Sequence, residues 1–205
     1  MEDLPPNHHA DYPQFTGIFG FVAGLTMIIG RGRDARLVAQ LASVTADQHV
    51  VDIGCGPGTA ARLTAAGGTS VTGIDPSGPM LRLARILTAI RRPRGTLDWV
   101  QAGAESMPLP DASADVVWSL ASVHHWPDLE GGIDEVTRVL RPGGMFLAVE
   151  KRTEPGATGN KSHGWTPQQA TDFAAMLADR GYRDTSTADH DIGNRRLVVA
   201  SGTHP

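Results

Sequence analysis

Short apolar runs alternate along the chain with longer segments in which apolar residues recur every three or four positions. The first run, 49–53, is rich in β-branched residues and predicts a buried strand. Later runs predict strands over 70–74, 97–102, 114–120, 145–150, 182–189 and 195–200. The longer segments predict helices over 17–30, 34–44, 59–66, 79–92, 129–140 and 166–180.

This alternation of strands and helices predicts an α/β fold, with an open parallel sheet covered by helices on both faces. The last two strands have no helix between them and are expected to form a closing pair. Sheets of this kind bind ligands at the carboxyl ends of their strands. Functional residues are therefore expected directly after the first four strands, at 54–58, at Asp75, at 102–105 and at 119–126.

The composition is that of one ordinary globular domain, with 205 residues and a mass of 21.7 kDa. A net charge of −4 and a pI of about 6.0 lack the basic surplus of nucleic-acid-binding proteins, so no nucleic-acid partner is expected. Cys55 is the only cysteine, which excludes an intrachain disulfide and a multi-cysteine metal site. The acidic, proline-rich start differs from a secretory signal, and a cytoplasmic location is expected.

The stretch 18–30 lacks charged residues and is followed by Arg31 and Arg33. Its 13 residues fall short of the roughly 20 that are needed to span a bilayer. We favour a helix that covers the core or a pocket over an interfacial helix that contacts a membrane. Residues 1–33 are expected to form an N-terminal arm and lid-like segment, and residues 34–205 the catalytic core of a single domain.

Five segments carry a set of motifs that belong together. They are VVDIGCGPGTA (50–60), VTGIDPSGPML (71–81), QAGAESMPLPDASADVVWS (101–119), SVHHWPD (122–128) and EVTRVLRPGGMFLAVE (135–150). In this order and spacing they resemble class I S-adenosylmethionine-dependent methyltransferases, in the subgroup with quinone-biosynthesis and other small-molecule or lipid methyltransferases. The resemblance covers roughly residues 35–200. It implies a three-layer sandwich around a Rossmann-like, mostly parallel seven-stranded sheet, whose last strand is antiparallel and lies between the fifth and sixth.

The resemblance implies S-adenosylmethionine as the cofactor. The glycine loop would approach its methionine end with Asp52 nearby, and Asp75 would bond its ribose diol. The implied cofactor-binding residues are Asp52, Gly54, Cys55, Gly56, Gly58, Asp75, Pro76, Met80, Gly103, Ala104, Glu105, Ser119 and Leu120. Two structural alternatives stay open: Asp75 as a helix N-cap, and Asp52 as a carboxylate that only satisfies loop N–H groups. Cys55 has no cationic neighbour in the sequence and is expected to be a small buried residue.

One position departs from the family pattern. Many relatives carry an aspartate that contacts the adenine amino group where this chain has Gly103. Backbone groups of Gly103 and Ala104 would then hold the adenine edge, and cofactor binding is expected to be retained but weaker. Glu105 is equally suited to capping the local loop or helix.

The candidate catalytic residues are His124 and His125, either of which could take the proton of an alcohol acceptor. Packing at a helix start is the alternative role. No metal site is expected, because adjacent side chains rarely converge and Asp128 is the only close carboxylate. The candidate substrate-binding residues are Tyr12, Phe15 and Phe19 of the N-terminal arm, together with Trp126.

The predicted function is methyl transfer to a small-molecule or lipid-linked acceptor, at oxygen. A regulatory protein that binds the same cofactor without catalysis is one alternative. A nicotinamide-dependent oxidoreductase is a second, but its fingerprint spaces the last two glycines three apart, whereas Gly54, Gly56 and Gly58 alternate. The sequence shows no tyrosine–lysine catalytic pair of the kind that such an oxidoreductase would use.

Overall fold

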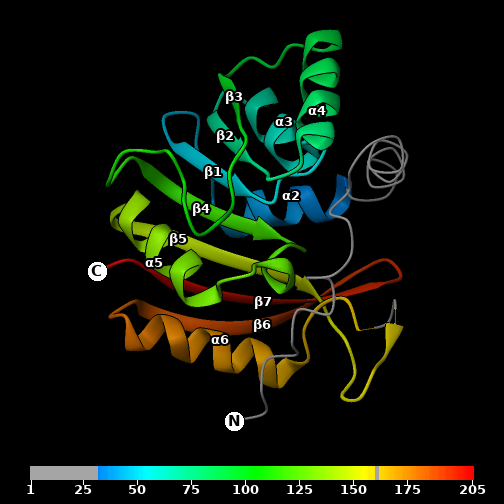
Figure 1. Ribbon diagram of the computed structural model, residues 1–205, viewed down its shortest axis with the longest axis vertical. Helices are drawn as coiled ribbons and strands as arrows, with labels where there is room; N and C mark the ends of the chain where they lie inside the picture. Colours follow the sequence, from blue (N-terminus) through cyan, green and yellow to red (C-terminus); the bar gives the residue numbers. More distant parts are fainter. Residues whose placement is uncertain (1–31, 160–161) are drawn as a thin grey trace.

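The computed structural model describes residues 32–159 and 162–205, in which seven strands form one sheet of order β3-β2-β1-β4-β5-β7-β6 (Figure 1). The strands are β1 (His49–Ile53), β2 (Ser70–Ile74), β3 (Leu97–Val100), β4 (Ala114–Leu120), β5 (Leu140–Lys151), β6 (Arg183–Ile192) and β7 (Arg195–Thr203). Strands β1 to β5 pair in parallel, whereas β7 is antiparallel to both β5 and β6. The predicted mostly parallel sheet, with its antiparallel last strand between the fifth and sixth, is confirmed.

The predicted helices of the described region are also confirmed, to within a few residues. They are α2 (Gly32–Leu41), α3 (Thr59–Ala66), α4 (Gly78–Ile90), α5 (Leu129–Val139) and α6 (Pro167–Asp179), with a short 3-10 helix η1 (Val123–His125). The largest boundary difference is in β5, which was expected to begin at Met145. It begins at Leu140, because Leu140 already pairs with Ala114 of β4 ahead of a shift in register, and the strand continues through Gly143 with its positive φ.

Polar side chains fix the starts of three helices. The Ser77 hydroxyl accepts a hydrogen bond from the Met80 N–H at the start of α4, and the Asp128 carboxylate accepts one from the Gly131 N–H at the start of α5. Helix α6 begins with a capping box, in which Thr166 and Gln169 each bond the other's backbone N–H. These caps set the directions in which the loops leave the sheet.

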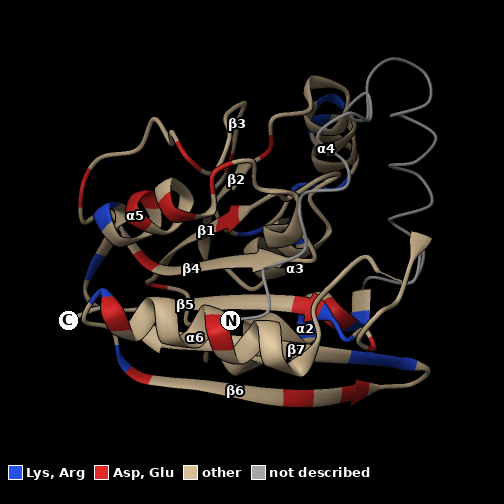
Figure 2. Cartoon of the chain, turned by 60° about the horizontal axis from the view of Figure 1, so that its bottom comes forward, with Lys and Arg blue, Asp and Glu red and all other residues tan. Residues whose placement is uncertain are grey.

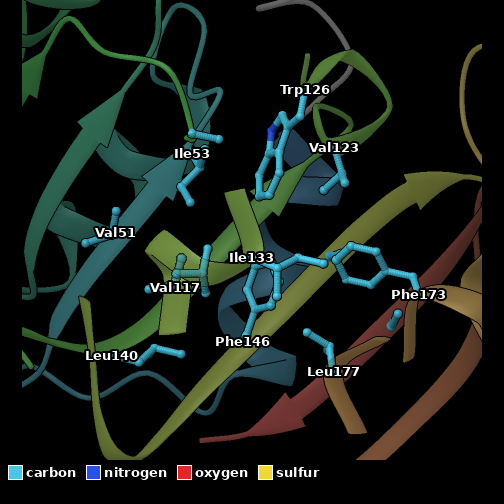
Figure 3. Close-up of a cluster of buried hydrophobic side chains, with 14 of the residues drawn as sticks. Val51, Ile53, Val117, Val123, Trp126, Ile133, Leu140, Phe146, Phe173 and Leu177 are labelled. Atoms are coloured by element: carbon cyan, nitrogen blue, oxygen red, sulfur yellow. The ribbon is translucent and has the colours of Figure 1, made fainter. Parts of the chain in front are cut away.

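Side chains of the strands alternate between two buried clusters, one on each face of the sheet. On one face, Val117 and Phe146 belong to a cluster that contains Ile133 of α5 and Phe173 of α6 (Figure 3). On the other face, Trp118 belongs to a cluster with residues of α2 and α3. Consecutive strand residues thus serve opposite clusters, and helices cover both faces as in a three-layer sandwich.

The loop after β5 leaves the sheet and returns to the same place. The Trp165 N–H donates to the Lys151 carbonyl oxygen (2.9 Å), and the Thr153 N–H donates to the Trp165 carbonyl oxygen (2.8 Å). Gly164 permits this approach with a φ of +133°, and a Cβ there would lie 2.0 Å from the Lys151 oxygen. The residues just before Trp165 are therefore held beside the end of β5.

The two helices on one face are also linked at the surface. Arg180, the C-terminal cap of α6, pairs with Glu130 and with Asp134 of α5, the latter at 2.8 Å. Charges of both signs lie along α5 and β6, whereas the charged residues of α6 itself are acidic (Figure 2). Exposed pairs of this kind contribute about 0–1 kcal/mol each, so the buried clusters supply most of the stability.

Among residues 32–159 and 162–205, no helix has the length and apolar character needed to cross a membrane. The predicted helix 17–30 and the charge-free stretch 18–30 lie outside the described residues. Nearly all of the predicted arm and lid-like segment, 1–33, lies outside them as well.

Replacing Ile133 by alanine is expected to lower the free energy of unfolding by about 2–5 kcal/mol, because its side chain is fully buried in the cluster under α5 and α6. Urea denaturation followed by circular dichroism measures the loss. Ile90→Ala is the matched control: Ile90 is 77% exposed at the end of α4, and its replacement is expected to change stability by less than about 0.5 kcal/mol. Equal losses in the two variants would contradict the described core.

Candidate functional site

The turn between β1 and α3 contains three glycines in the left-handed region. Gly54, Gly56 and Gly58 have φ values of +67°, +54° and +73°. The Gly54 and Cys55 N–H groups both donate to the Ile74 carbonyl oxygen, at 2.8 and 3.0 Å, so the turn is tied to the end of β2. A side chain at any of the three glycine positions would strain this backbone.

The three glycines differ in what surrounds them. A Cβ at Gly54 would lie 1.8 Å from the Ser122 hydroxyl, and a Cβ at Gly58 would lie 2.0 Å from the Trp99 ring. At Gly56, nothing in the described protein lies within 4 Å of the Cβ position. Two of the glycines therefore serve internal packing, whereas Gly56 leaves an open side at which a ligand can approach the backbone.

Asp75, directly after β2, ties the glycine turn to the start of the next helix. Its carboxylate accepts hydrogen bonds from the Gly56 N–H through Oδ2 and from the Ser77 N–H through Oδ1, both at 2.8 Å. The N-cap of α4 is Ser77, so the alternative interpretation of Asp75 as the helix N-cap is wrong. Asp75 is 8% exposed, and burial raises the pKa of its carboxyl.

Asp52 lies deeper than Asp75, near the end of strand β1, and is 1% exposed. Its Oδ2 accepts a hydrogen bond from the Ala61 N–H in the first turn of α3, at 3.2 Å. Burial raises the pKa of Asp52 to about 7, with the nearby Asp75 adding to the shift. The Asp52 side chain thus braces the helix after the glycine turn through this hydrogen bond.

Cys55 is buried, as expected. Burial, together with Asp52 and Asp75, raises the pKa of its thiol, and a thiol held in the protonated form is a poor nucleophile.

The two residues that were predicted beside the adenine differ in exposure. Met80 is buried, at 2% exposure in the first turn of α4. Pro76 is exposed, and its carbonyl oxygen accepts a hydrogen bond from the Gln101 amide (3.1 Å).

The segment after β3 carries a carboxylate next to the glycine that departs from the family pattern. A Cβ at Gly103 would lie 2.3 Å from Oε1 of Glu105. The Glu105 side chain therefore folds back over Gly103 and fills the space that a side chain at 103 would occupy. Ala104 is buried beneath this segment, in the cluster that α5 and α6 cover.

Two buried serines lie at the end of β4 and just after it. Ser119 is fully buried, and its hydroxyl has no hydrogen-bond partner among the described residues. Ser122 follows, with its hydroxyl against Gly54 as noted above, and Leu120 is 8% exposed. Trp126 is also 8% exposed; its indole packs closely on Gly132 of α5 and points into the buried cluster (Figure 3).

The candidate catalytic histidines lie in η1, immediately after this segment. His124 Nδ1 lies 2.7 Å from Oε2 of Glu150, a residue of β5 that is 0% exposed. The backbone N–H of His124 also donates a hydrogen bond to Oε1 of Glu150, at 3.4 Å. His125 and His163 lie next to His124, with ring centroids 3.9 and 6.0 Å from its ring. The prediction of no metal site considered His124 and His125 with Asp128 as the only close carboxylate, and the fold adds a third histidine, His163.

Sequence reasoning missed Glu150 and His163, whereas Ser122 lies in the segment 119–126 that was expected to be functional but had no role of its own. Glu150 was assigned to the fifth strand, and a carboxylate that ends an apolar run is a signal for a buried pair. His163 is 38 positions from His125, and its approach depends on the returning loop after β5. The predicted substrate-binding residues Tyr12, Phe15 and Phe19 lie outside the described residues.

Residues 51–148 match a family model described as a methyltransferase domain. The chain is 35% identical over 118 residues to the ubiquinone/menaquinone biosynthesis C-methyltransferase of Rubrivivax gelatinosus, with 58% of this chain and 45% of that protein covered. It is 41% identical over 125 residues to the 27-O-demethylrifamycin SV methyltransferase of Amycolatopsis mediterranei, with 60% and 45% covered. The chain thus spans about half the length of these curated relatives.

A solved structure has the same fold. The crystal structure of a S-adenosylmethionine-dependent methyltransferase from Aquifex aeolicus matches with a TM-score of 0.75 at 14% sequence identity, covering 90% of this chain and 98% of that one. At this level of identity the match shows the shared fold, and the arrangement of the site depends on the residues described above.

The raised pKa of Asp52 predicts a specific pH dependence of stability. The folded state holds the proton up to a pH of about 7, whereas a carboxyl in the unfolded chain releases it near pH ~3.9. The contribution of this group to stability is therefore fully present below about pH 4 and is lost as the pH rises toward about 7. Asp52→Asn keeps an acceptor for the Ala61 N–H but cannot ionise, so it is expected to remove the dependence.

Thermal melting of both proteins between pH 4 and 8 measures the effect. The melting temperature of the Asp52→Asn variant, relative to the unmodified protein, is expected to rise by about 5 °C or more across this range. Asp98→Asn, at an exposed position of β3, is the control and is expected to show a constant difference. A constant difference for Asp52→Asn as well would contradict the burial-raised pKa.

Proposed function

We propose that the chain is a class I S-adenosylmethionine-dependent methyltransferase and that it transfers a methyl group from S-adenosylmethionine to a small-molecule acceptor. The observation that carries the proposal is the open side of Gly56 beside the buried carboxylate of Asp75. When bound, S-adenosylmethionine supplies a methyl group activated by a positively charged sulfur.

The residues of the site fit this cofactor. An ionised carboxylate offers about four acceptor positions, and Asp75 uses two of them for the Gly56 and Ser77 N–H groups. It therefore keeps acceptor capacity for the two hydroxyls of a ribose without releasing the glycine turn. The open backbone at Gly56 and the partnerless hydroxyl of Ser119 would face the methionine end.

We assign the adenine contact that Gly103 lacks to Glu105. The Glu105 carboxylate folds over Gly103. From this position, two residues later in the chain, it would accept a hydrogen bond from the adenine amino group. Pro76 and Met80 would flank the same end of the cofactor. Cofactor affinity is then retained in spite of the departure from the family pattern.

The His124–Glu150 pair suits proton transfer from an alcohol acceptor. A carboxylate oxygen 2.7 Å from Nδ1 favours the tautomer that carries its hydrogen there, which leaves the lone pair on Nε2. Nε2 would take the proton of the acceptor hydroxyl, and Glu150 would stabilise the resulting imidazolium. This role supports methylation at oxygen, on a small-molecule or lipid-linked acceptor, with Tyr12, Phe15 and Phe19 as the proposed acceptor contacts. Trp126, the fourth predicted contact, instead points its indole into the buried cluster.

Residues 1–31 come directly before helix α2. We propose that the chain is a single domain, in which the segment 1–33 covers the acceptor side of the core formed by residues 34–205. A regulatory protein that binds S-adenosylmethionine without catalysis is the second candidate. Incorporation of labelled methyl groups into a cell extract separates the two, because a regulator binds the cofactor without transferring the label.

Replacing Asp75 by asparagine is expected to weaken S-adenosylhomocysteine binding at least about tenfold, because charged hydrogen bonds to the ribose are lost. Isothermal titration calorimetry measures the affinity, and Asp98→Asn is the control with an exposed carboxylate. If the unmodified protein does not bind S-adenosylhomocysteine at millimolar concentration, the proposed function is wrong. Thermal melting of the variant checks that the glycine turn is still held.

With a labelled acceptor in hand, His124→Ala is expected to lower kcat by about 10²–10⁴-fold if His124 acts as the general base. His125→Ala is measured separately, because the two histidines were predicted together. Unchanged turnover in both variants would remove the general-base role and leave the cofactor site intact.

A further inference from the structure

Three histidines from two distant segments meet at the carboxyl ends of β4 and β5. Each of His124, His125 and His163 offers one ring nitrogen, and these three nitrogens all lie within 4.8 Å of one another. All three residues are partly buried rather than splayed into solvent. Neither the methyltransferase fold nor the proposed cofactor contacts require a cluster of imidazoles here.

The local backbone explains how the three rings converge. The adjacent residues His124 and His125 lie in the tight 3-10 turn η1, which brings their ring centroids to 3.9 Å. His163 precedes Gly164, whose φ of +133° lets the loop press against the Lys151 carbonyl. The Trp165–Lys151 hydrogen bond then fixes this loop base beside the end of β5.

Glu150 supplies the support that a metal-binding histidine needs. Its carboxylate is fully buried and lies 2.7 Å from Nδ1 of His124. In metal sites, a ligating histidine characteristically donates its other ring N–H to a carboxylate, which fixes the ring and raises the basicity of the ligating nitrogen. The same arrangement leaves Nε2 as the His124 nitrogen that can bind a metal ion.

We propose that His124, His125 and His163 bind one divalent transition-metal ion, with Glu150 as the positioning residue for His124. Three imidazoles suit Zn²⁺ and its neighbours in the first transition row, and three protein ligands leave a fourth position open. A point equidistant from three atoms 4.8 Å apart lies about 2.8 Å from each, so movements of under about 1 Å reach the ~2.1 Å of a metal–nitrogen bond.

The role of the ion rests on the proposed function, whereas its binding does not. The cluster follows Ser122, whose hydroxyl lies against Gly54 of the glycine turn, so the ion would lie beside the proposed cofactor site. When bound, the ion would favour loss of the proton of a hydroxyl held at its open position. His124 Nε2 would then be a metal ligand and the proton would pass to solvent, so the general-base role proposed above for His124 would belong to the metal-free protein.

The test uses an untagged protein of residues 1–205 in which His8 and His9, outside the described residues, are replaced by alanine. After dialysis against a chelator and then buffer, titration with ZnCl₂ is followed by calorimetry, and titration with CoCl₂ by visible absorption. One equivalent of each ion is expected to bind. His125→Ala and His163→Ala are each expected to weaken Zn²⁺ binding at least about tenfold, whereas His190→Ala, on β6, is expected to leave it unchanged.

Glu150→Gln tests the positioning role. The variant is expected to bind Zn²⁺ about 10–100-fold more weakly and to have an altered Co²⁺ spectrum. The melting temperature of the metal-free protein is expected to stay the same. A merely structural role of Glu150 would change the melting temperature and leave the Co²⁺ spectrum as it is. The absence of one-equivalent binding, or equal binding by His163→Ala and His190→Ala, would overturn the proposal. His163 lies outside the helices and strands, so His163→Ala is expected to fold normally. The test therefore remains valid even if His124→Ala fails to fold.

S-adenosylhomocysteine is titrated into the same samples. Its binding without Zn²⁺ binding would overturn the metal site and leave the proposed function standing. Zn²⁺ binding without S-adenosylhomocysteine binding would support the metal site and contradict the proposed function.

Discussion

The hydrogen bonds of the Asp75 carboxylate hold the candidate site together. One oxygen accepts the N–H of Gly56 in the turn after β1, and the other accepts the N–H of Ser77 at the start of α4. A single buried side chain thus fixes two neighbouring loops at the carboxyl edge of the sheet. Because both N–H groups are satisfied from inside the protein, the outer side of Gly56 stays open to a ligand.

Most of the fold could be predicted from the sequence because local signals and burial agree. In β1 and β4 every apolar residue faces one of two covered faces, so the strands appear in the sequence as short continuous apolar runs. The start of β5 was predicted too late, because the Pro142-Gly143-Gly144 stretch indicates a turn although Leu140 already pairs with β4. The position of β7 between β5 and β6 was implied by the family resemblance, since its pairing partners are distant in sequence.

The site was less predictable, because its residues act through contacts between distant loops. The alternating glycines indicated a ligand turn, yet Gly54 and Gly58 are also required by Ser122 and Trp99, neither of which the motif contains. His124 and His125 were identified as chemically able residues. Their partners Glu150 and His163 become visible only when β4 and β5 are paired and the loop after β5 is closed.

The central claim is that the open side of Gly56 and the carboxylate of Asp75 form the site for S-adenosylmethionine. The most direct measurement is a crystal structure of the protein with S-adenosylhomocysteine. The account predicts that both ribose hydroxyls lie about 2.5–2.9 Å from the Asp75 carboxylate, which keeps its bond to the Gly56 N–H. A nucleoside bound away from Asp75, or a glycine turn that must release Asp75 to admit it, would contradict the account.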